Sequence, residues 1–420
     1  MATSEDSLTA KDTVKPTAAT ARYARKKLAI VAAASGILNR DGIKGMTLAN
    51  VAASVGLITT SVTYYFKRKE DLAVACFLEG IAQFDALITQ ALQESDARSR
   101  LRRFLDLWLD LNRRIAAGDG HPVPMFNDIR SLQRPQRTVV VDAYMRFFGK
   151  VCQLFGDDEF PWLDDNNRRS RAHLIAEQIF WTVAWLPRYD VEDYDRIRDR
   201  MFDLFACGLA GTGREWNPVA LSLQDILAPT EPQPTPRETF LIAATRLINE
   251  RGYRGASVEK ISARLNVTKG SFYHHNEAKD DLVVECFDRS FEAIRRIQRA
   301  VTGRAENHWW KLSTIAATLM AYQLSDRGPL LRTSALSAVP LAIRYEMVRK
   351  SNRVSDRFAS IISDGIATGC IRAVDPFIAA QMLTMTLNAS AEISWWVPQA
   401  PLSAATDLYA KPMLMGIFTP

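Results

Sequence analysis

The chain repeats itself once, and this duplication limits the possible architectures more than any other feature of the sequence. A constant shift of 210 positions brings identical residues of the two halves into register without a gap. Because 210 is half of the 420 residues, each half is expected to be one copy of the same unit. The aligned pairs are Ala33 and Ala243, Asn39 and Asn249, Gly42 and Gly252, Gly45 and Gly255, Ala53 and Ala263, Ser61 and Ser271, Lys69 and Lys279, Leu72 and Leu282, Cys76 and Cys286, and Phe77 and Phe287.

The segments around the two copies indicate how the chain divides. Prolines at 218, 229, 232, 234 and 236 predict an extended linker over residues 214–236, and a Thr-, Ala- and Lys-rich start predicts a disordered arm over residues 1–22. Apolar spacing is helical throughout and no strand pattern is present, so an all-α fold of two tandem units is predicted. Each unit has a short N-terminal part, residues 23–72 and 237–282, and a longer helical part, residues 73–213 and 283–420.

Both short parts have the caps and spacing of a helix-turn-helix. Gly42 and Gly252 are expected to end the first helix with a left-handed C-cap, and Thr47 and Ser257 stand where the second helix needs an N-cap. In the second copy, Asn266 suits the tight turn, and Thr268 can cap a third helix, as Thr59 can in the first copy. Two short helices joined in this way, with a longer helix behind them, place the last helix in the major groove of DNA. We call residues 23–72 the first reader and residues 237–282 the second reader.

The second reader closely resembles the DNA-binding signature of tetracycline-repressor-type (TetR) regulators. The resemblance is carried by Arg251-Gly-Tyr253, Ala256-Ser-Val258, Leu265 to Asn276 and Lys279-Asp-Asp-Leu282. The first reader resembles it more loosely, since Thr59-Thr60 replaces the usual Lys-Gly pair. A net charge of +6 and a pI near 9.0 are compatible with a polyanionic partner.

The resemblance implies which residues contact an operator in double-stranded DNA. In the second reader these are Ser257, Thr268, Lys269, Gly270, Ser271, Tyr273, His274, His275 and Lys279. In the first reader they are Thr47, Thr59, Thr60, Ser61, Thr63, Tyr64, Tyr65 and Lys69. Since no lysine stands at the Lys269 position of the first reader, weaker DNA binding is expected there, with the basic residues Arg22, Arg25, Lys26 and Lys27 compensating.

The resemblance also implies that the longer parts hold a small-molecule pocket and end in helices that pair in a four-helix interface. In one fused chain these helices would pair intramolecularly and give a pseudo-dimer. The pseudo-dimer would bind an asymmetric operator as a repressor and be released by a small-molecule effector. Further dimerisation stays open. Aromatic residues are dense in both longer parts, but an aromatic stripe is more often core than pocket, so no ligand contact is assigned.

Other function classes find little support. No nucleophile triad, paired acids or phosphate-binding glycine loop is present, so neither an enzyme nor a cofactor is expected. The adjacent pair His274-His275 lacks a third ligand, which argues against a metal site, and scattered cysteines fit a reducing cytoplasm without disulfides. The sequence has no uninterrupted apolar run of the ~18 residues that a membrane span requires. The alternative is a small-molecule sensor or protein-interaction scaffold whose first reader no longer binds DNA.

Overall fold

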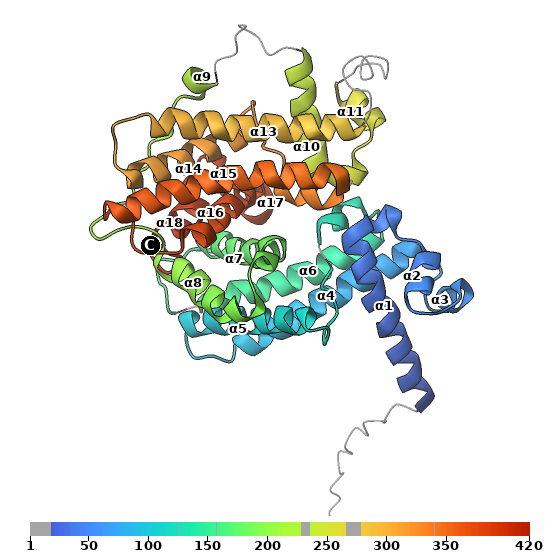
Figure 1. Ribbon diagram of the computed structural model, residues 1–420. Coiled ribbons are helices and arrows are strands. Elements are labelled where there is room, and N and C mark those ends of the chain that lie inside the picture. Colours follow the sequence, from blue (N-terminus) through green and yellow to red (C-terminus); the bar gives the residue numbers. More distant parts are fainter. Residues whose placement is uncertain (1–17, 125, 157, 228–235, 266–278, 340) are drawn as a thin grey trace, which may run out of the picture.

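The structure is a computed structural model that describes residues 18–420 except 125, 157, 228–235, 266–278 and 340. Within these residues it contains helices and turns and no named strand; the one β-bridge pairs Ala210 with Ile371. The all-α prediction is therefore confirmed. Figure 1 shows two stacked layers of helices, with the first half (residues 18–213) below the second half (residues 236–420).

The first half begins with the first reader and continues into a helical bundle. Its elements are α1 (Ala18–Gly45), α2 (Leu48–Ser54), α3 (Thr59–Tyr65), α4 (Lys69–Ala91), α5 (Ala97–Ala116), η1 (Phe126–Ser131), α6 (Gln136–Cys152), η2 (Gln153–Phe155), α7 (Asp165–Trp185), η3 (Leu186–Arg188), η4 (Val191–Asp193) and α8 (Tyr194–Cys207). Helix α1 begins at Ala18, so the arm expected over residues 1–22 already contains helix at its end. Residues 1–17 lie outside the described part.

In its described part, the second half resembles the first in the order of its elements. After α9 (Leu223–Ile226) in the connecting segment come α10 (Pro236–Gly255), α11 (Val258–Leu265), α13 (Lys279–Thr302), α14 (His308–Leu324), η5 (Thr333–Ala338), α15 (Leu341–Ala367), α16 (Pro376–Ser390), α17 (Ile393–Trp396), η6 (Leu402–Ala404), the π-helical η7 (Thr406–Ala410) and α18 (Lys411–Met415).

Side chains at equivalent positions make equivalent contacts in the two halves. Asn39 Nδ2 donates to the carbonyl of Val123 at 2.8 Å, and Asn249 Nδ2 donates to the carbonyl of Leu330 at 2.8 Å. Cys76 Sγ lies 3.6 Å from the Val31 carbonyl oxygen, and Cys286 Sγ lies 3.7 Å from that of Leu241. The sequence register is thus repeated in three-dimensional contacts.

Two glycines set the direction that the chain takes after the first helix of each reader. Gly42 has φ 62° and ψ 179°, and Gly252 has φ 70° and ψ 160°. The predicted positive φ is confirmed, but ψ near 180° is not that of a left-handed C-cap. This region of backbone space is essentially closed to residues with a Cβ, so the requirement for glycine is stricter than expected.

Local sequence fixes the beginnings of several bundle helices. Asp96, Asp164 and Asn307 each accept a hydrogen bond from the backbone N–H three residues on, at 3.0, 2.7 and 2.9 Å. Helix α4 is long and apolar enough to cross a membrane by length and composition. It packs against α1, α5 and α6 and contributes Phe77 and Phe84 to the core, which accounts for its apolar character.

The two halves are joined by a continuous interface around α7, α8, α16 and η7–α18. Gln178 Nε2 donates to the Met382 carbonyl at 2.6 Å, and Arg171 Nε donates to the Ile417 carbonyl at 2.9 Å. Arg372 pairs with Asp203 at 2.8 Å beside the β-bridge. Buried amide and guanidinium donors that find backbone acceptors in the other half fix the relative position of the halves.

The connecting segment is packed rather than extended in its described part, residues 214–227. Trp216 Nε1 donates to Asp407 at 2.8 Å, and the Leu221 N–H donates to Thr318 Oγ1 at 3.0 Å. Arg296 donates to the Ile226 carbonyl at 2.7 Å. The proline pattern predicted an extended linker, but Trp216 and the neighbouring leucines bury apolar surface against the second half. Residues 228–235 lie outside the described part.

Candidate DNA interface and cavity between the halves

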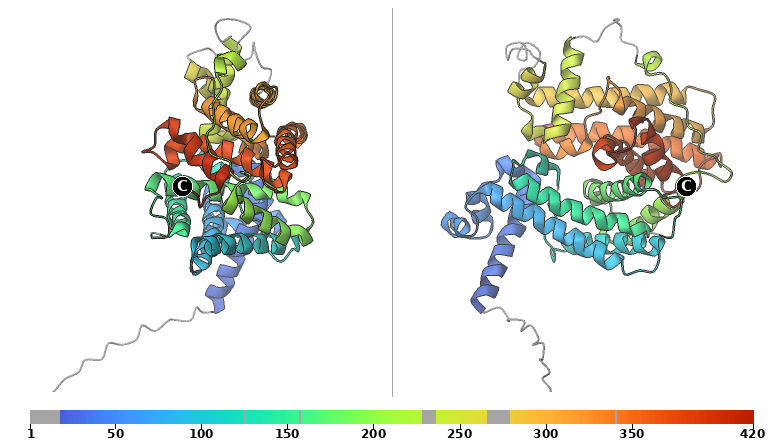
Figure 2. Two further views of the ribbon diagram at one scale, coloured as in Figure 1. Left: turned by 90° about the vertical axis from the view of Figure 1, so that its left-hand side faces the viewer. Right: turned by 180° about the vertical axis from the view of Figure 1, so that it is seen from behind.

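Both readers lie at the same end of the molecule. In Figure 1, α2 and α3 stand at the lower right and α11 at the upper right, while the C-terminus lies at the opposite side; the rear view in Figure 2 agrees. The short helices η1 and η5 each contact both α1 and α10. The first helices of the two readers are therefore connected through η1 and η5.

The first reader is a formed helix-turn-helix. Thr47 Oγ1 accepts from the Asn50 N–H at 3.1 Å, as its predicted N-cap role requires, and Gly56 (φ 67°) makes the turn. Helix α3 buries Val62 and leaves Thr59, Thr60 and Tyr64 exposed, with Ser61, Thr63 and Tyr65 half-buried. The N-cap of α3 is Ile58, which makes no side-chain cap bond, so the capping role suggested for Thr59 is wrong by one position.

An aromatic cluster extends the first reader onto α1. The ring of Tyr23 lies 4.8 Å from that of Tyr65 and 6.1 Å from that of Tyr64, and Lys27 Nζ lies 5.6 Å from the centre of the Phe66 ring. Tyr64 is 68% exposed despite these contacts. The N-terminal turns of α1, which carry the expected basic residues, are thus held beside α3. Tyr23 was not singled out in the sequence, because its partners are more than forty positions away.

Lys69 makes a structural contact within the first reader. Its ammonium group donates to the carbonyl of Lys44 at 3.0 Å and so links the start of α4 to the end of α1. A lysine at a helix C-terminus satisfies a carbonyl that the helix leaves free. The phosphate contact suggested by resemblance stays a prediction.

The second reader is described only in part. Ser257 Oγ accepts from the Lys260 N–H at 3.4 Å, which is a long cap bond. The suggested contacts Thr268, Lys269, Gly270, Ser271, Tyr273, His274 and His275 lie outside the described residues, as does the side chain of Lys279, the first residue of α13. Their roles stay predictions.

A cavity of about 750 Å³ lies between the two halves. The first half contributes side chains from α4, α5, η1, α6 and α7, and the second half contributes side chains from α10, η5, α15, α16 and α17. Several of the aromatic residues to which the sequence assigned no ligand contact line this cavity: Trp108, Phe126, Tyr144, Phe180, Trp181, Trp395 and Trp396. Its volume falls in the range of small-molecule sites.

A buried charge network forms one wall of the cavity. Glu392, 11% exposed, accepts from both Arg130 and Arg332, and also from Trp396 Nε1 at 2.9 Å. Arg130 donates in addition to the Asn249 carbonyl of α10 at 2.6 Å. Charges contributed by both halves therefore meet beside the second reader.

Burial changes the protonation equilibria of this network. Burial lowers the pKa of Arg332 well below its usual value, and the neighbouring charge of Arg130 adds to the effect; burial also lowers the pKa of Arg130. Burial acts to raise the pKa of Glu177, but His173 and the two arginines outweigh it, so that pKa falls. Burial lowers the pKa of His173. Two guanidinium ions thus balance two carboxylates beside an imidazole that favours the neutral form.

The same network has the spacing of a metal site but the wrong charge. His173 Nε2 lies 3.7 Å from Glu177 Oε1 and 3.8 Å from Glu392 Oε2, and the candidate ligand atoms lie within 4.8 Å of one another. However, Arg130 and Arg332 already neutralise both carboxylates, so a divalent cation would bring two uncompensated charges into a buried cluster. The arrangement therefore disfavours a cation.

The grouping of Arg130, Glu177, Arg332 and Glu392 with His173 could not be found from sequence periodicity. His173 and Glu177 are one helical turn apart, which hints at a shared face, but Glu392 lies 262 positions from Arg130 and no local pattern connects them. Burial raises the pKa of Cys76 and of Cys286 to about 12, so neither is a reactive thiolate at neutral pH.

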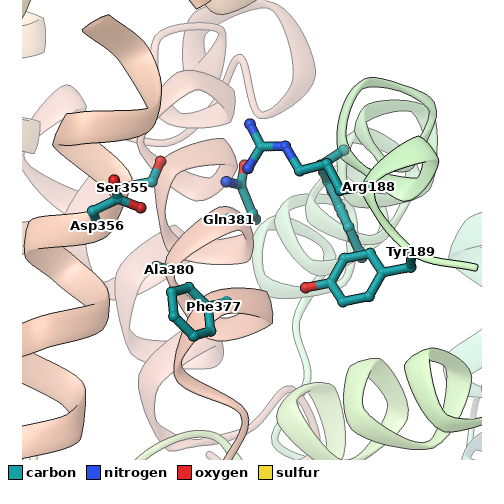
Figure 3. A pocket seen from close by; sticks show the side chains of 8 residues that line it. Arg188, Tyr189, Ser355, Asp356, Phe377, Ala380 and Gln381 are labelled. Carbon is teal, nitrogen blue, oxygen red and sulfur yellow. The ribbon is translucent and has the colours of Figure 1, made fainter. Parts of the chain in front are cut away.

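A second hollow between the halves is too small for a ligand. It lies between residues 185–189 of the first half and helices α15 and α16, and Figure 3 shows Arg188 and Tyr189 opposite Asp356 and Phe377. Its volume is about 20 Å³, which holds a single water molecule.

Solved structures that are similar to part of this chain include transcriptional regulators. One is the TetR family transcriptional regulator PfmR from Thermus thermophilus, with a TM-score of 0.36 and 20% identity over 42% of this chain and 97% of that one.

Sequence comparison is more direct. Over 139 residues the chain is 28% identical to the HTH-type transcriptional repressor DhaR of Mycobacterium sp. (strain GP1), covering 32% of this chain and 70% of DhaR. Over 149 residues it is 24% identical to the transposon Tn10 TetC protein of Escherichia coli, covering 35% of this chain and 73% of TetC. Residues 240–286 match the family model of bacterial regulatory proteins of the tetR family. Residues 240–286 thus match the TetR family, and the chain is similar to transcriptional regulators of that kind over about a third of its length.

Proposed function

We propose that this regulator is a repressor that acts as a single-chain pseudo-dimer on an asymmetric operator and is released by a small-molecule effector. The observation that supports the proposal most is the position of the readers: α2 and α3 of the first and α11 of the second lie at one end of a single body (Figure 1). An intact interface around α7, α8, α16 and α18 holds them there within one chain. We expect the protein to work in the cytoplasm.

Asymmetry follows from the different reading residues. The first reader presents Thr59, Thr60 and Tyr64 at exposed positions of α3. The sequence places Lys269 and Tyr273 in the corresponding part of the second reader. Hydroxyl and phenol groups contact bases and phosphates differently from an ammonium group, so the two half-sites are expected to differ.

Effector release needs a path from the ligand to a reader. The cavity is lined by Arg246, Asn249, Gly252 and Tyr253 of α10, the first helix of the second reader. A ligand that prefers one position of α10 over another would shift the population of DNA-binding conformations. The cavity is therefore the effector site in this proposal.

DNA selection from a random library, followed by scrambling of each half-site, tests the proposal. The expected site has two different halves, and Tyr64→Ala should weaken binding by about tenfold, with the whole loss at the half-site bound by the first reader. The control is Phe377→Ala, which removes an exposed ring on α16 at a distance from α3.

Two results would count against it. Equal affinity for a perfect palindrome of either half-site would contradict the asymmetry. Selection of a single half-site, with DNA affinity unchanged in Tyr64→Ala, would instead favour the sensor or scaffold alternative, in which the first reader has lost DNA binding.

A further inference from the structure

We propose that the cavity between the halves binds one organic anion per chain, a ligand with an aromatic or aliphatic body and one anionic group, held by Arg332 and Arg130. The inference deepens the proposed function, on which it rests, by naming the chemical class of the effector. Nothing in the family match assigns a ligand to this cavity.

The charges of the lining favour an anion. Five lining residues are arginines, Arg130, Arg137, Arg246, Arg332 and Arg344, and three are glutamates, Glu177, Glu250 and Glu392. Glu250 already pairs with Arg264 at 2.7 Å. The described lining therefore carries an excess of positive charge in a site where water screens charge poorly. An anionic group enters such a site favourably and a cationic group does not.

The hydrogen-bonding groups of the wall point to the same chemistry. Arg332 Nε, Thr333 Oγ1 and Trp181 Nε1 are buried and have no hydrogen-bond partner among the described residues. All three can donate, and the backbone N–H of Thr333 is already used by Asn388 at 3.2 Å. A carboxylate or sulfonate has several acceptor lone pairs, so a small adjustment of the wall would allow one anionic group to accept from more than one of these donors.

Arginine is also the appropriate residue for this task. Arg332 uses part of its guanidinium group to pair with Glu392, while its Nε has no partner in the part of the chain that the structure describes. A planar guanidinium group can pair with two acceptors side by side, and it stays charged where an ammonium group would lose its proton. Glu392 holds Arg332 and Arg130 together until an anion competes for them.

The rest of the cavity accommodates the apolar body. Phe180 packs edge-on against Phe84 at 4.8 Å, and Tyr144 lies 5.6 Å from Trp396 of the other half. These rings form walls that belong to both halves. Because one cavity is shared by two halves, one ligand per chain is expected, not one per reader.

The cavity contacts the two readers unequally. Its lining includes residues of α10 but no described residue of α1. A bound anion would therefore restrain the second reader directly and the first reader only through η1 and η5. Hydrogen exchange should slow in α10 on ligand binding and change less in α1.

A matched pair of fluorescent probes tests the ligand class. 8-Anilinonaphthalene-1-sulfonate carries one anionic group, and N-phenyl-1-naphthylamine is the same ring system without it. We expect the sulfonate to saturate at one molecule per chain. Arg332→Gln should weaken sulfonate binding by about tenfold or more and leave binding of the neutral probe within about twofold, because a charge-assisted hydrogen bond is lost.

Controls separate this effect from misfolding. Arg295→Gln removes a half-buried surface arginine outside the cavity, which pairs with Glu292 at 2.8 Å, and should change the binding of neither probe. Arg137 lines the cavity outside the Glu392 network, so Arg137→Gln should also weaken binding of the sulfonate and not of the neutral probe. This second variant keeps the test valid if circular dichroism shows that Arg332→Gln does not fold.

Failure of the anion site can be distinguished from failure of the proposed repressor function. The inference fails if the folded protein binds no sulfonate, binds both probes equally, loses both equally in Arg332→Gln and Arg137→Gln, or takes up Zn²⁺ at His173 in preference to anions. If Arg332-dependent sulfonate binding is found in a protein that binds no DNA, the anion site stands and the repressor proposal fails.

Discussion

Replacing Glu392 by glutamine is expected to destabilise the fold and, at the same time, to tighten anion binding. The carboxylate is the common partner of Arg130 and Arg332 and is 11% exposed. Removing one member of a buried ion pair costs about 3–5 kcal/mol, because the remaining charge is left without compensation. The amide oxygen of glutamine can still accept one of these hydrogen bonds, so we expect a loss of about 3 kcal/mol, at the lower end of that range.

Urea unfolding followed by circular dichroism measures this loss. The matched control is Glu292→Gln on α13, whose carboxylate pairs with Arg295 at the surface with 48% of its side chain exposed. An exposed pair of this kind contributes less than about 1 kcal/mol. The difference between the two variants therefore isolates burial from the mere loss of a charge.

Anion binding supplies the second half of the prediction. Without the Glu392 carboxylate, the two guanidinium groups have no competing partner, so the sulfonate probe should bind more tightly to Glu392→Gln than to the unchanged protein. It should also restore part of the lost stability, because a ligand that binds only the folded state stabilises it. Equal losses in Glu392→Gln and Glu292→Gln, or unchanged sulfonate affinity, would refute the reasoning.

Three further predictions concern the pH dependence of stability, the backbone at Gly252 and the aromatic cluster of the first reader. Stability should fall as the pH drops below about 6.5, because burial disfavours protonation of native His173 while the unfolded chain takes up a proton. It should fall again below about 4.5, because Glu177 loses its charge. Urea titrations of His173→Gln should lack the first decline. Gly252→Ala should cost about 1–3 kcal/mol, whereas Gly36→Ala, in an open helical position, should be neutral or stabilising, both by thermal unfolding. Tyr23→Ala should weaken DNA binding by the first reader, measured by fluorescence anisotropy, and lower the free energy of unfolding in urea by less than about 1.5 kcal/mol. Unchanged DNA affinity would show that the ring cluster does not position α3.

Features with a local cause were predictable from the sequence. Helical periodicity and the absence of strand patterns indicated the all-α class, and the glycine at each first helix end indicated the positive φ of Gly42 and Gly252. The N-cap role of Thr47 follows from its side chain and position alone. These properties depend on a few neighbouring residues, which is the range over which sequence patterns are informative.

Features that depend on distant partners were not predictable. Trp216 looked like part of a free linker because its acceptor, Asp407, is 191 positions away. The network of Arg130, Arg332 and Glu392 likewise combines residues that each look like ordinary surface charges in their own segments. Only the packing of one half on the other decides that they are buried together.

The stoichiometry of the complex with DNA tests the central claim most directly. Sedimentation of the full chain with a duplex containing the selected site should give one chain per duplex, and footprinting of that complex should show protection of both half-sites. Two chains per duplex, or protection of a single half-site by one chain, would contradict the claim that both readers of one chain bind the same duplex.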